Sequence, residues 1–153
     1  MRLHIVAIGR ARAGPEATLF EHYKDRVTLW PITLTEQDLR KRTAPDKLAE
    51  AEADLLLQAI PDAAYVVALD ERGKQQSSRA FAKLLNDLQD DGRRDVAFLI
   101  GGADGLAPPV RERADKVLSL GQATWPHMLV RGLLTEQIYR AQQIIAGHPY
   151  HRD

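Results

Sequence analysis

The chain has 153 residues, of which 44% are apolar and 27% charged, and its 21 Lys and Arg residues balance 21 Asp and Glu residues. Zero net charge excludes a global field that would steer the protein to nucleic acid, and the absence of cysteine excludes disulfides, cysteine-ligated zinc and thiol catalysis. The start "MRLHIVAIGR" lacks the features of a signal peptide, and no apolar run approaches the ~18 residues of a membrane span. We therefore expect one cytoplasmic domain.

Apolar, β-rich runs alternate with helical patterns along the chain. The runs that predict strands are 3–8, 27–34, 64–69, 96–101 and 116–120. The patterns that predict helices are 44–60, a stretch that begins at Ser78, 108–115, and a long stretch from about Pro126 to Gly147. This alternation predicts an α/β fold with a mostly parallel sheet and flanking helices. Pro31 favours the edge of the sheet, or a break, for the second run.

Three loops that follow predicted strands are the best candidates for a ligand site. They are 70–74, 101–105 and 121–127. In parallel α/β folds the ligand lies beyond the carboxyl ends of the strands, and glycine lets a ligand approach the backbone closely. None of the loops matches a phosphate-binding fingerprint. Read alone, "GGADG" (101–105) is more typical of a tight turn than of a cofactor site.

The last helix and the tail "GHPYHRD" (147–153) allow two interpretations. Arg131, Glu136, Tyr139 and Arg140 lie away from the apolar face of the helix, as a solvated face or as phosphate-binding groups. The tail is either a solvated terminus or the cover of an active site.

The histidines raise the alternative of a metal-assisted phosphoesterase. Its ligands would be His127, His148 and His151, although Pro149 prevents a regular helical pair of the last two. His4 lies within a predicted strand and favours a structural or surface role.

Four motifs resemble the RlmH family of SPOUT-class methyltransferases. They are "LDERGKQQSS", "FLIGGADGL", "LSLGQATWPHMLVRGLLTEQIYRA" and "GHPYHR", in this order. The opening "RLHIVAIGR" is also similar to the family's first strand, whereas 11–60 shows little likeness. The family methylates N3 of a pseudouridine in 23S ribosomal RNA. The resemblance implies a C-terminal trefoil knot in the sheet fold and a homodimer that acts on ribosomal RNA.

The same resemblance implies an S-adenosylmethionine site and no metal. The residues carried over for the cofactor are Leu69, Gly101, Leu120, Gly121, Gln122, Ala123, Thr124 and Trp125. Because this cofactor has no phosphate, backbone amides and apolar contacts suit it better than a phosphate cradle would. Trp125 stands where many relatives have leucine, and we expect it to preserve an apolar wall.

The target nitrogen carries a proton that must leave, so a base or an ordered water is needed. The expected catalytic residues are His151, Arg152, Tyr150 and Tyr139. The expected RNA contacts are Arg10, Arg12, Arg131, Arg140 and His148, with Arg40, Lys41 and Arg42 as further phosphate contacts. The resemblance also suggests that the tail of one subunit completes the site of the other. A non-catalytic ribosome-binding protein of the same fold is the main alternative.

Overall fold

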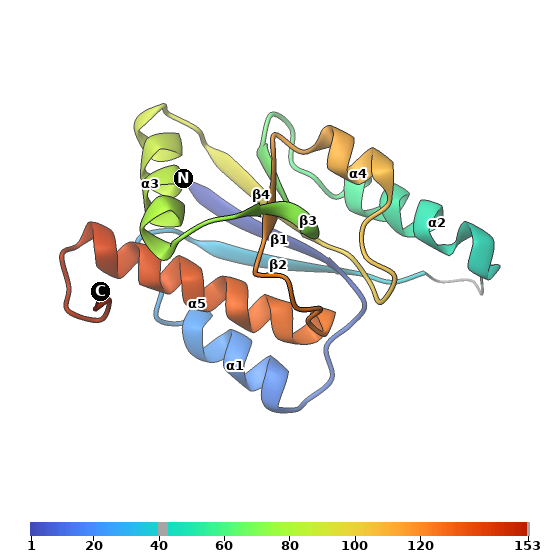
Figure 1. The fold of residues 1–153 in the computed structure, drawn as a ribbon, viewed down its shortest axis with the longest axis horizontal. Helices are drawn as coiled ribbons and strands as arrows, with labels where there is room; N and C mark the ends of the chain where they lie inside the picture. Colours follow the sequence, from blue (N-terminus) through green and yellow to red (C-terminus); the bar gives the residue numbers. More distant parts are fainter. Residues whose placement is uncertain (40–42, 153) are drawn as a thin grey trace.

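The computed structural model of the protein describes residues 1–39 and 43–152. Five parallel strands form one sheet in the order β2-β1-β4-β3-β5 (Figure 1). The strands are β1 (Arg2–Ile8), β2 (Ile32–Gln37), β3 (Tyr65–Gln75), β4 (Asp95–Ile100) and β5 (Lys116–Ser119). The helices are α1 (Pro15–Lys24), α2 (Pro45–Gln58), α3 (Ser78–Asp90), α4 (Pro108–Arg113) and α5 (His127–Ile145). The predicted α/β class is confirmed.

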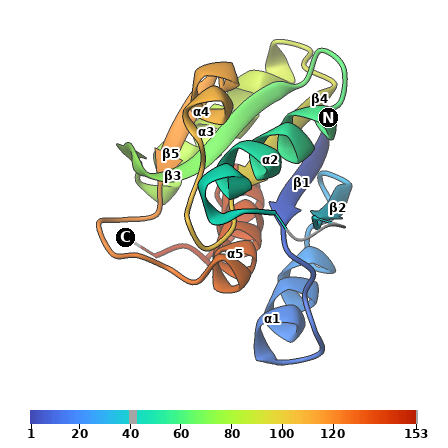
Figure 2. The same ribbon diagram turned by 90° about the vertical axis from the view of Figure 1, so that its right-hand side faces the viewer.

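The helices cover the two faces of the sheet and make a core on each (Figure 2). On β1, Leu3 and Ile5 join the core that α1, α3 and α5 cover, whereas Val6 and Ile8 join the core under α2 and α4. Successive strand residues point to opposite faces, so a strand that is apolar throughout contributes to both cores. Buried β4 follows this rule over its whole length.

The second strand begins later than the sequence predicts. Residues 27–31 are not part of β2, which pairs with β1 only from Ile32 onward. The backbone N–H groups of Thr28 and Leu29 instead donate to Gln142 Oε1 over 2.8 and 2.9 Å, and Trp30 is fully buried. The segment therefore crosses the C-terminal part of α5 before the strand starts. The expected edge position is confirmed, because β2 is the first strand in the order.

Helix α1 was not predicted from the sequence. Its amphipathic signal is weak, since Phe20 is its only buried residue. It is held by close packing on α5, where a Cβ on Gly132 would lie 2.7 Å from Leu19 Cδ2. A larger residue at 132 would push the two helices apart.

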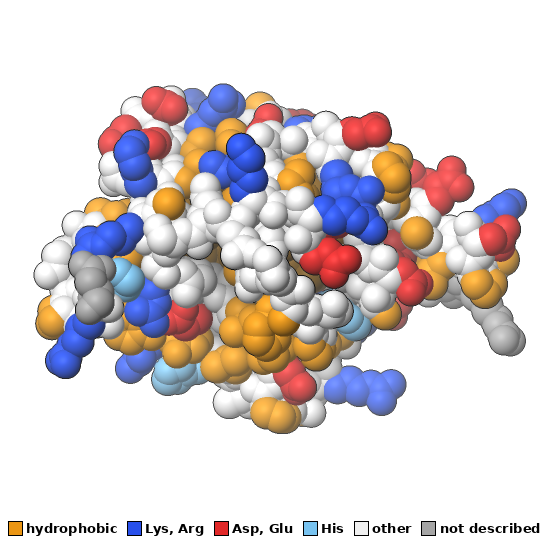
Figure 3. All heavy atoms as spheres, in the orientation of Figure 1, with side chains coloured by type: hydrophobic (Ala, Val, Ile, Leu, Met, Phe, Trp, Pro, Cys, Tyr) orange, Lys and Arg blue, Asp and Glu red, His pale blue; other side chains and the backbone are white. Residues whose placement is uncertain are grey.

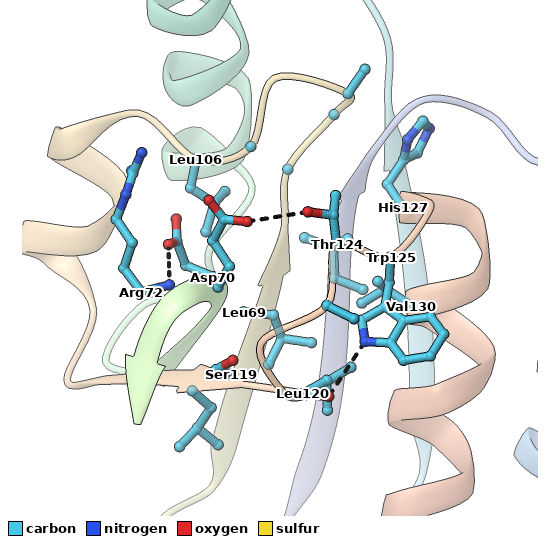
Figure 4. Close-up of a pocket in the computed structure, with 18 of the residues that line it drawn as sticks. Leu69, Asp70, Arg72, Leu106, Ser119, Leu120, Thr124, Trp125, His127 and Val130 are labelled. Atoms are coloured by element: carbon cyan, nitrogen blue, oxygen red, sulfur yellow. Dashed lines mark hydrogen bonds between the residues drawn. The ribbon is translucent and has the colours of Figure 1, made fainter. Parts of the chain in front are cut away.

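Strand β3 continues through 70–74, which the sequence predicts as a loop. Its pairing with β5 shifts register between Leu69 and Lys74, and Gly73 lies at that shift. A Cβ on Gly73 would stand 2.6 Å from the carbonyl carbon of Leu118, so the two backbones touch. The irregular stretch turns Asp70, Glu71 and Arg72 toward the carboxyl end of the sheet (Figure 4).

The trefoil knot implied by the resemblance stays a prediction.

Among residues 1–39 and 43–152, no helix combines the length and the apolar character that crossing a membrane requires.

Candidate functional site

A cavity of about 360 Å³ opens beyond the carboxyl ends of β3, β4 and β5 (Figure 4). We call it the strand-end cavity. Its lining includes Leu69, Asp70, Glu71, Arg72, Ile100, Gly101, Asp104, Leu106, Leu118, Ser119, Leu120, Gly121, Ala123, Thr124, Trp125, His127 and Val130. Seven of the eight residues expected to hold the cofactor are among those that line it, and only Gln122 is not. The sequence prediction therefore points to one continuous cavity.

Glycines let the loops of this cavity fold tightly. A Cβ on Gly101 would stand 2.6 Å from the carbonyl oxygen of Gly105, so only glycine fits there without a shift of the backbone. Gly121 has a φ of +115°, and no described atom lies within 4 Å of the position of its missing Cβ. The Ser119 hydroxyl fixes this turn by donating to the Gly121 carbonyl over 2.7 Å. Backbone is therefore presented to the cavity with little side chain in front of it.

Arg111 ties two walls of the cavity together. From α4, its guanidinium donates to the Leu106 carbonyl and to Asp70 Oδ2, the latter over 3.4 Å. Asp70 Oδ1 also accepts the backbone N–H of Arg72 over 2.9 Å. Sequence reasoning missed Arg111, and a lone arginine on a short helix offers no signal that could have found it.

The rim of the cavity carries acidic groups. Asp70, Glu71 and Asp104 line it, and Glu71 accepts a hydrogen bond from the Thr124 hydroxyl over 3.5 Å. Behind this rim, burial and the charge of Asp104 raise the pKa of Glu52 on α2. Asp70 is already paired with Arg111, so Glu71 and Asp104 are the carboxylates on this wall that could face a ligand with positive charge.

His127 stands on the wall that the cavity shares with a second depression. This N-terminal groove, of about 580 Å³, is lined by residues 10–17, Phe20, Glu21, Leu34, Glu36, His127, Met128 and Arg131. Burial, and then the nearby charge of Arg131, lower the pKa of His127. A lowered pKa leaves the imidazole neutral near pH 7.

Arg131 does not have the position expected of an RNA contact. It is 2% exposed, and its guanidinium donates to the carbonyls of Ile8 and Gly9 over 2.9 and 2.8 Å. It also pairs with Glu36 on β2. Its burial and its partners argue against Arg131 as an RNA contact, because this part of α5 packs against the ends of β1 and β2 and the guanidinium is occupied there.

Arg10 and Arg12 are exposed along the N-terminal groove, in accordance with a role in binding. The chain is held beside them by the Ala11 N–H, which donates to Glu36 Oε1 over 2.7 Å. Arg40, Lys41 and Arg42 lie outside the described residues.

The expected tail residues gather on the second half of α5. The Tyr150 hydroxyl donates to Glu136, the Tyr150 ring meets the Tyr139 ring edge-on at 4.8 Å, and Arg140 pairs with Glu136. Arg140 also donates to His151 Nδ1 over 3.4 Å. Burial, with hydrogen bonds and charge from Tyr23 and Glu136, raises the pKa of Tyr150.

This tail cluster (Glu136, Tyr139, Arg140, Tyr150 and His151) is apart from the strand-end cavity. Val130 lines the cavity, and Tyr139 lies roughly 14 Å farther along α5 at about 1.5 Å per residue. His148 accepts the Tyr150 N–H over 3.2 Å, and Arg152 is exposed. The structure thus brings three of the four expected catalytic side chains, Tyr139, Tyr150 and His151, together on α5, but outside the lining of the strand-end cavity of their own chain.

The metal alternative finds no support in the arrangement of the histidines. His127 begins α5, whereas His148 and His151 follow its other end. Within 1–39 and 43–152, no group of three or more metal-ligating side chains occurs.

Comparison with known proteins gives the family. The model described as "Predicted SPOUT methyltransferase" matches residues 1–151. A protein of Rhodospirillum centenum named "Ribosomal RNA large subunit methyltransferase H" is 60% identical over 152 residues, 99% of each chain. Its namesake in Paramagnetospirillum magneticum is 54% identical over 99% of each chain.

Solved structures agree in fold. A probable methylase family protein from Haemophilus influenzae Rd KW20 has a TM-score of 0.60 at 12% identity, with 99% of this chain and 70% of that chain covered. A probable methyltransferase from Bordetella pertussis Tohama I has a TM-score of 0.58 at 16% identity, with 92% and 95% covered. These comparisons show that the chain belongs to the SPOUT methyltransferase family, and the cavity at the strand ends agrees with that assignment.

Proposed function

We propose that this protein transfers a methyl group from S-adenosylmethionine to N3 of a pseudouridine in 23S ribosomal RNA. The observation that carries the proposal is its 60% identity, over 99% of both chains, to a protein named ribosomal RNA large subunit methyltransferase H. We propose further that the chain acts as one domain, as a homodimer, on the assembled ribosome in the cytoplasm. The match of residues 1–151 to one family model supports the single domain.

The residues of the strand-end cavity fit this cofactor. S-adenosylmethionine supplies, when bound, a methyl group on a positively charged sulfonium. Apolar side chains such as Leu69 and Leu118 and the bare backbone at Gly121 suit its adenine and methionine. The carboxylates of Glu71 and Asp104 complement its charge. The eight residues that would hold it are Leu69, Gly101, Leu120, Gly121, Gln122, Ala123, Thr124 and Trp125.

The tail supplies the proton acceptor in this proposal. The N3–H proton of the target base has to leave, and imidazole is the side chain that exchanges a proton most readily near neutral pH. The raised pKa of Tyr150 keeps its hydroxyl protonated, so Tyr150 suits a donor and His151 suits the base. Arg152 would bind phosphate or the developing imide charge, and Tyr139 would position Tyr150 through their ring contact.

Geometry favours a site shared by two subunits. No side chain of the tail cluster lines the strand-end cavity of its own chain, and only Glu136 reaches the neighbouring cavity of about 370 Å³ that shares Trp125 with it. If a second subunit presents its tail to this cavity, the tail can stay docked on α5 of its own chain and still lie beside the cofactor of the partner. This requirement supports the homodimer.

RNA binding would rest on local contacts. The N-terminal groove with Arg10 and Arg12 adjoins the strand-end cavity at His127, so a strand bound along the groove would lead to the cofactor. On the face seen in Figure 3, Lys and Arg side chains are spread among Asp and Glu. Such a surface suits recognition of an assembled ribosome by shape better than capture of free RNA. Arg140 and His148 would add contacts near the tail.

Calorimetric titration with S-adenosylmethionine in EDTA tests the cofactor, and transfer of labelled methyl to ribosomes, large subunits or free 23S RNA tests the reaction. We expect saturable binding and transfer that chelator does not affect. Binding without transfer to any of these substrates would favour a non-catalytic ribosome-binding protein, and dependence on added divalent metal would favour the phosphoesterase. A His151→Ala variant that binds the cofactor but transfers no methyl would support the role of the tail.

A further inference from the structure

Trp125 exposes an indole ring at the mouth of the strand-end cavity. Its side chain is 42% exposed, although tryptophan is the largest apolar residue of the chain. It also lines a neighbouring cavity of about 370 Å³ between α3 and α5, so it stands on the wall that the two cavities share. The other tryptophan, Trp30, is fully buried. An exposed indole at a binding site is a surface that a ligand can cover.

The ring of Trp125 is held in place. Its Nε1–H donates to the Leu120 carbonyl over 3.4 Å, within the same loop (Figure 4). Thr124 anchors the loop on one side through Glu71, and Pro126 on the other restricts Trp125 to extended backbone. Because the hydrogen bond is made by the edge of the ring, this contact does not occupy the flat face of the indole.

Base stacking can supply affinity for RNA that the zero net charge of this protein does not provide. A chain with 21 basic and 21 acidic residues gains little from a general attraction to phosphate. Proteins that bind unpaired RNA bases obtain much of their affinity from aromatic side chains on which the bases stack. A base must also leave its stack before an enzyme can reach an atom of its ring, and an aromatic surface compensates for the lost stacking.

We propose that Trp125 is a stacking platform for an unpaired RNA base at the mouth of the strand-end cavity. The proposal rests on the function proposed above and adds a substrate contact to a residue whose loop was expected only to hold the cofactor. The occupant is either the target base or its immediate neighbour, and both share the chemistry of an unstacked base.

Burial favours a base of the RNA over the adenine of the cofactor. The apolar residues deeper in the cavity are almost fully buried, with Ile100 3% and Leu118 5% exposed. These residues can enclose a cofactor, whereas the indole lies at the rim and keeps 42% of its surface in solvent. A residue at the rim is positioned to contact the RNA, which approaches from solvent after the cofactor has filled the cavity.

The test compares Trp125→Leu, which keeps an apolar side chain, with Trp125→Phe, which keeps an aromatic face. Leu29→Ala is the matched control, because Leu29 is also 42% exposed and lies beside Gln142. For each protein we would measure the KM for ribosomes, the Kd for S-adenosylmethionine by titration, and the oligomeric state. We expect Trp125→Leu to raise the KM for ribosomes about tenfold, within the range of base–aromatic stacking. The Kd for the cofactor should change much less, because leucine keeps the apolar wall that Trp125 gives to the cavity. Trp125→Phe should recover most of the loss.

Four results would overturn the proposal. A raised Kd for the cofactor with an unchanged KM for ribosomes would assign the indole to adenine. A loss in Trp125→Phe as large as in Trp125→Leu would remove stacking as the cause, and a change in oligomeric state would place Trp125 at a subunit contact. Absence of transfer by the unaltered protein would overturn the proposed function itself, whereas transfer that none of the variants changes would overturn only this inference.

Discussion

The Tyr150 hydroxyl donates a hydrogen bond to Glu136 Oε1 over 3.1 Å, and this contact docks the tail on the second half of α5. Glu136 accepts Arg140 Nε over 3.0 Å at the same oxygen. Tyr150 is thus docked against α5.

We predict that a chain truncated after Pro149 binds S-adenosylmethionine as the full chain does, because the removed residues do not line the strand-end cavity. Methyl transfer should fall about 100-fold or more, since the proposed base is lost. Titration and a ribosome methylation assay check the two halves. Tyr150→Phe is the matched control, with a smaller loss, because it removes the hydroxyl but keeps the ring against Tyr139. Turnover that survives truncation would refute the role of the tail.

Gly101→Ala should weaken cofactor binding at least about tenfold, because an unavoidable Cβ contact of 2.6 Å with Gly105 displaces the loop. Gly14→Ala is its control. Gly14 has an extended φ of 167°, and the nearest atom to its Cβ position is 3.6 Å away. Calorimetric titration compares both variants with the unaltered protein. Equal affinities for all three would show that the 101–105 loop does not take part in binding the cofactor.

Arg131→Met should lower the free energy of unfolding by about 3 kcal/mol, since it leaves the Glu36 carboxylate and two carbonyls without their buried partner. Urea denaturation measures the loss. If Arg131→Met has normal stability but binds ribosomes poorly, Arg131 is an RNA contact after all, contrary to what its burial indicates.

The Arg10→Ala/Arg12→Ala double variant should behave in the opposite way. Both side chains are exposed, so stability should not change. The KM for ribosomes should rise, and its dependence on the logarithm of salt concentration should lose a slope of about 2, one unit for each phosphate contact. Lys83→Ala, at an exposed lysine on α3 that pairs with Asp87, is the control. Equal salt slopes in all three proteins would contradict the proposed groove contacts.

Asp95 predicts a stability that depends on acid pH. A hydrogen bond from Arg2, assisted by another from His4, lowers the pKa of Asp95 from 3.8 to about 2 despite the opposing effect of desolvation. A carboxyl with a lowered folded pKa stabilises the fold above its unfolded pKa, and the contribution disappears as pH falls from about 4 to about 2. Asp95→Asn should therefore cost about 1–2 kcal/mol at pH 7 and lose most of that cost near pH 2. A cost that is constant with pH would show that the charge does not stabilise the fold.

The sequence predicted the architecture where one physical signal dominated. Strands 64–69 and 96–101 are buried on both faces, so their apolar runs were recognised and β4 agrees within a residue. The signal was misleading at 27–31, where Trp30 is buried by the loop and not by the sheet. It was too weak at α1, which buries only Phe20 in the core and packs closely on α5 where Leu19 meets Gly132.

The sequence by itself determined the fold class, the three segments after the strands that line the site and, through its motifs, the family, because period, glycine position and motif order are all encoded locally. Only the structure showed that one of these segments, 70–74, continues β3. Only the tertiary structure decided which of the candidate charges are available. Arg131 and Arg10 are the same residue type, and nothing in the sequence separates them. In the structure Arg131 is 2% exposed against the ends of β1 and β2, whereas Arg10 is exposed on the N-terminal groove. Likewise, only the structure separated the tail cluster from the cavity, since side chains on one helix share a role only if the helix faces and length bring them to one place.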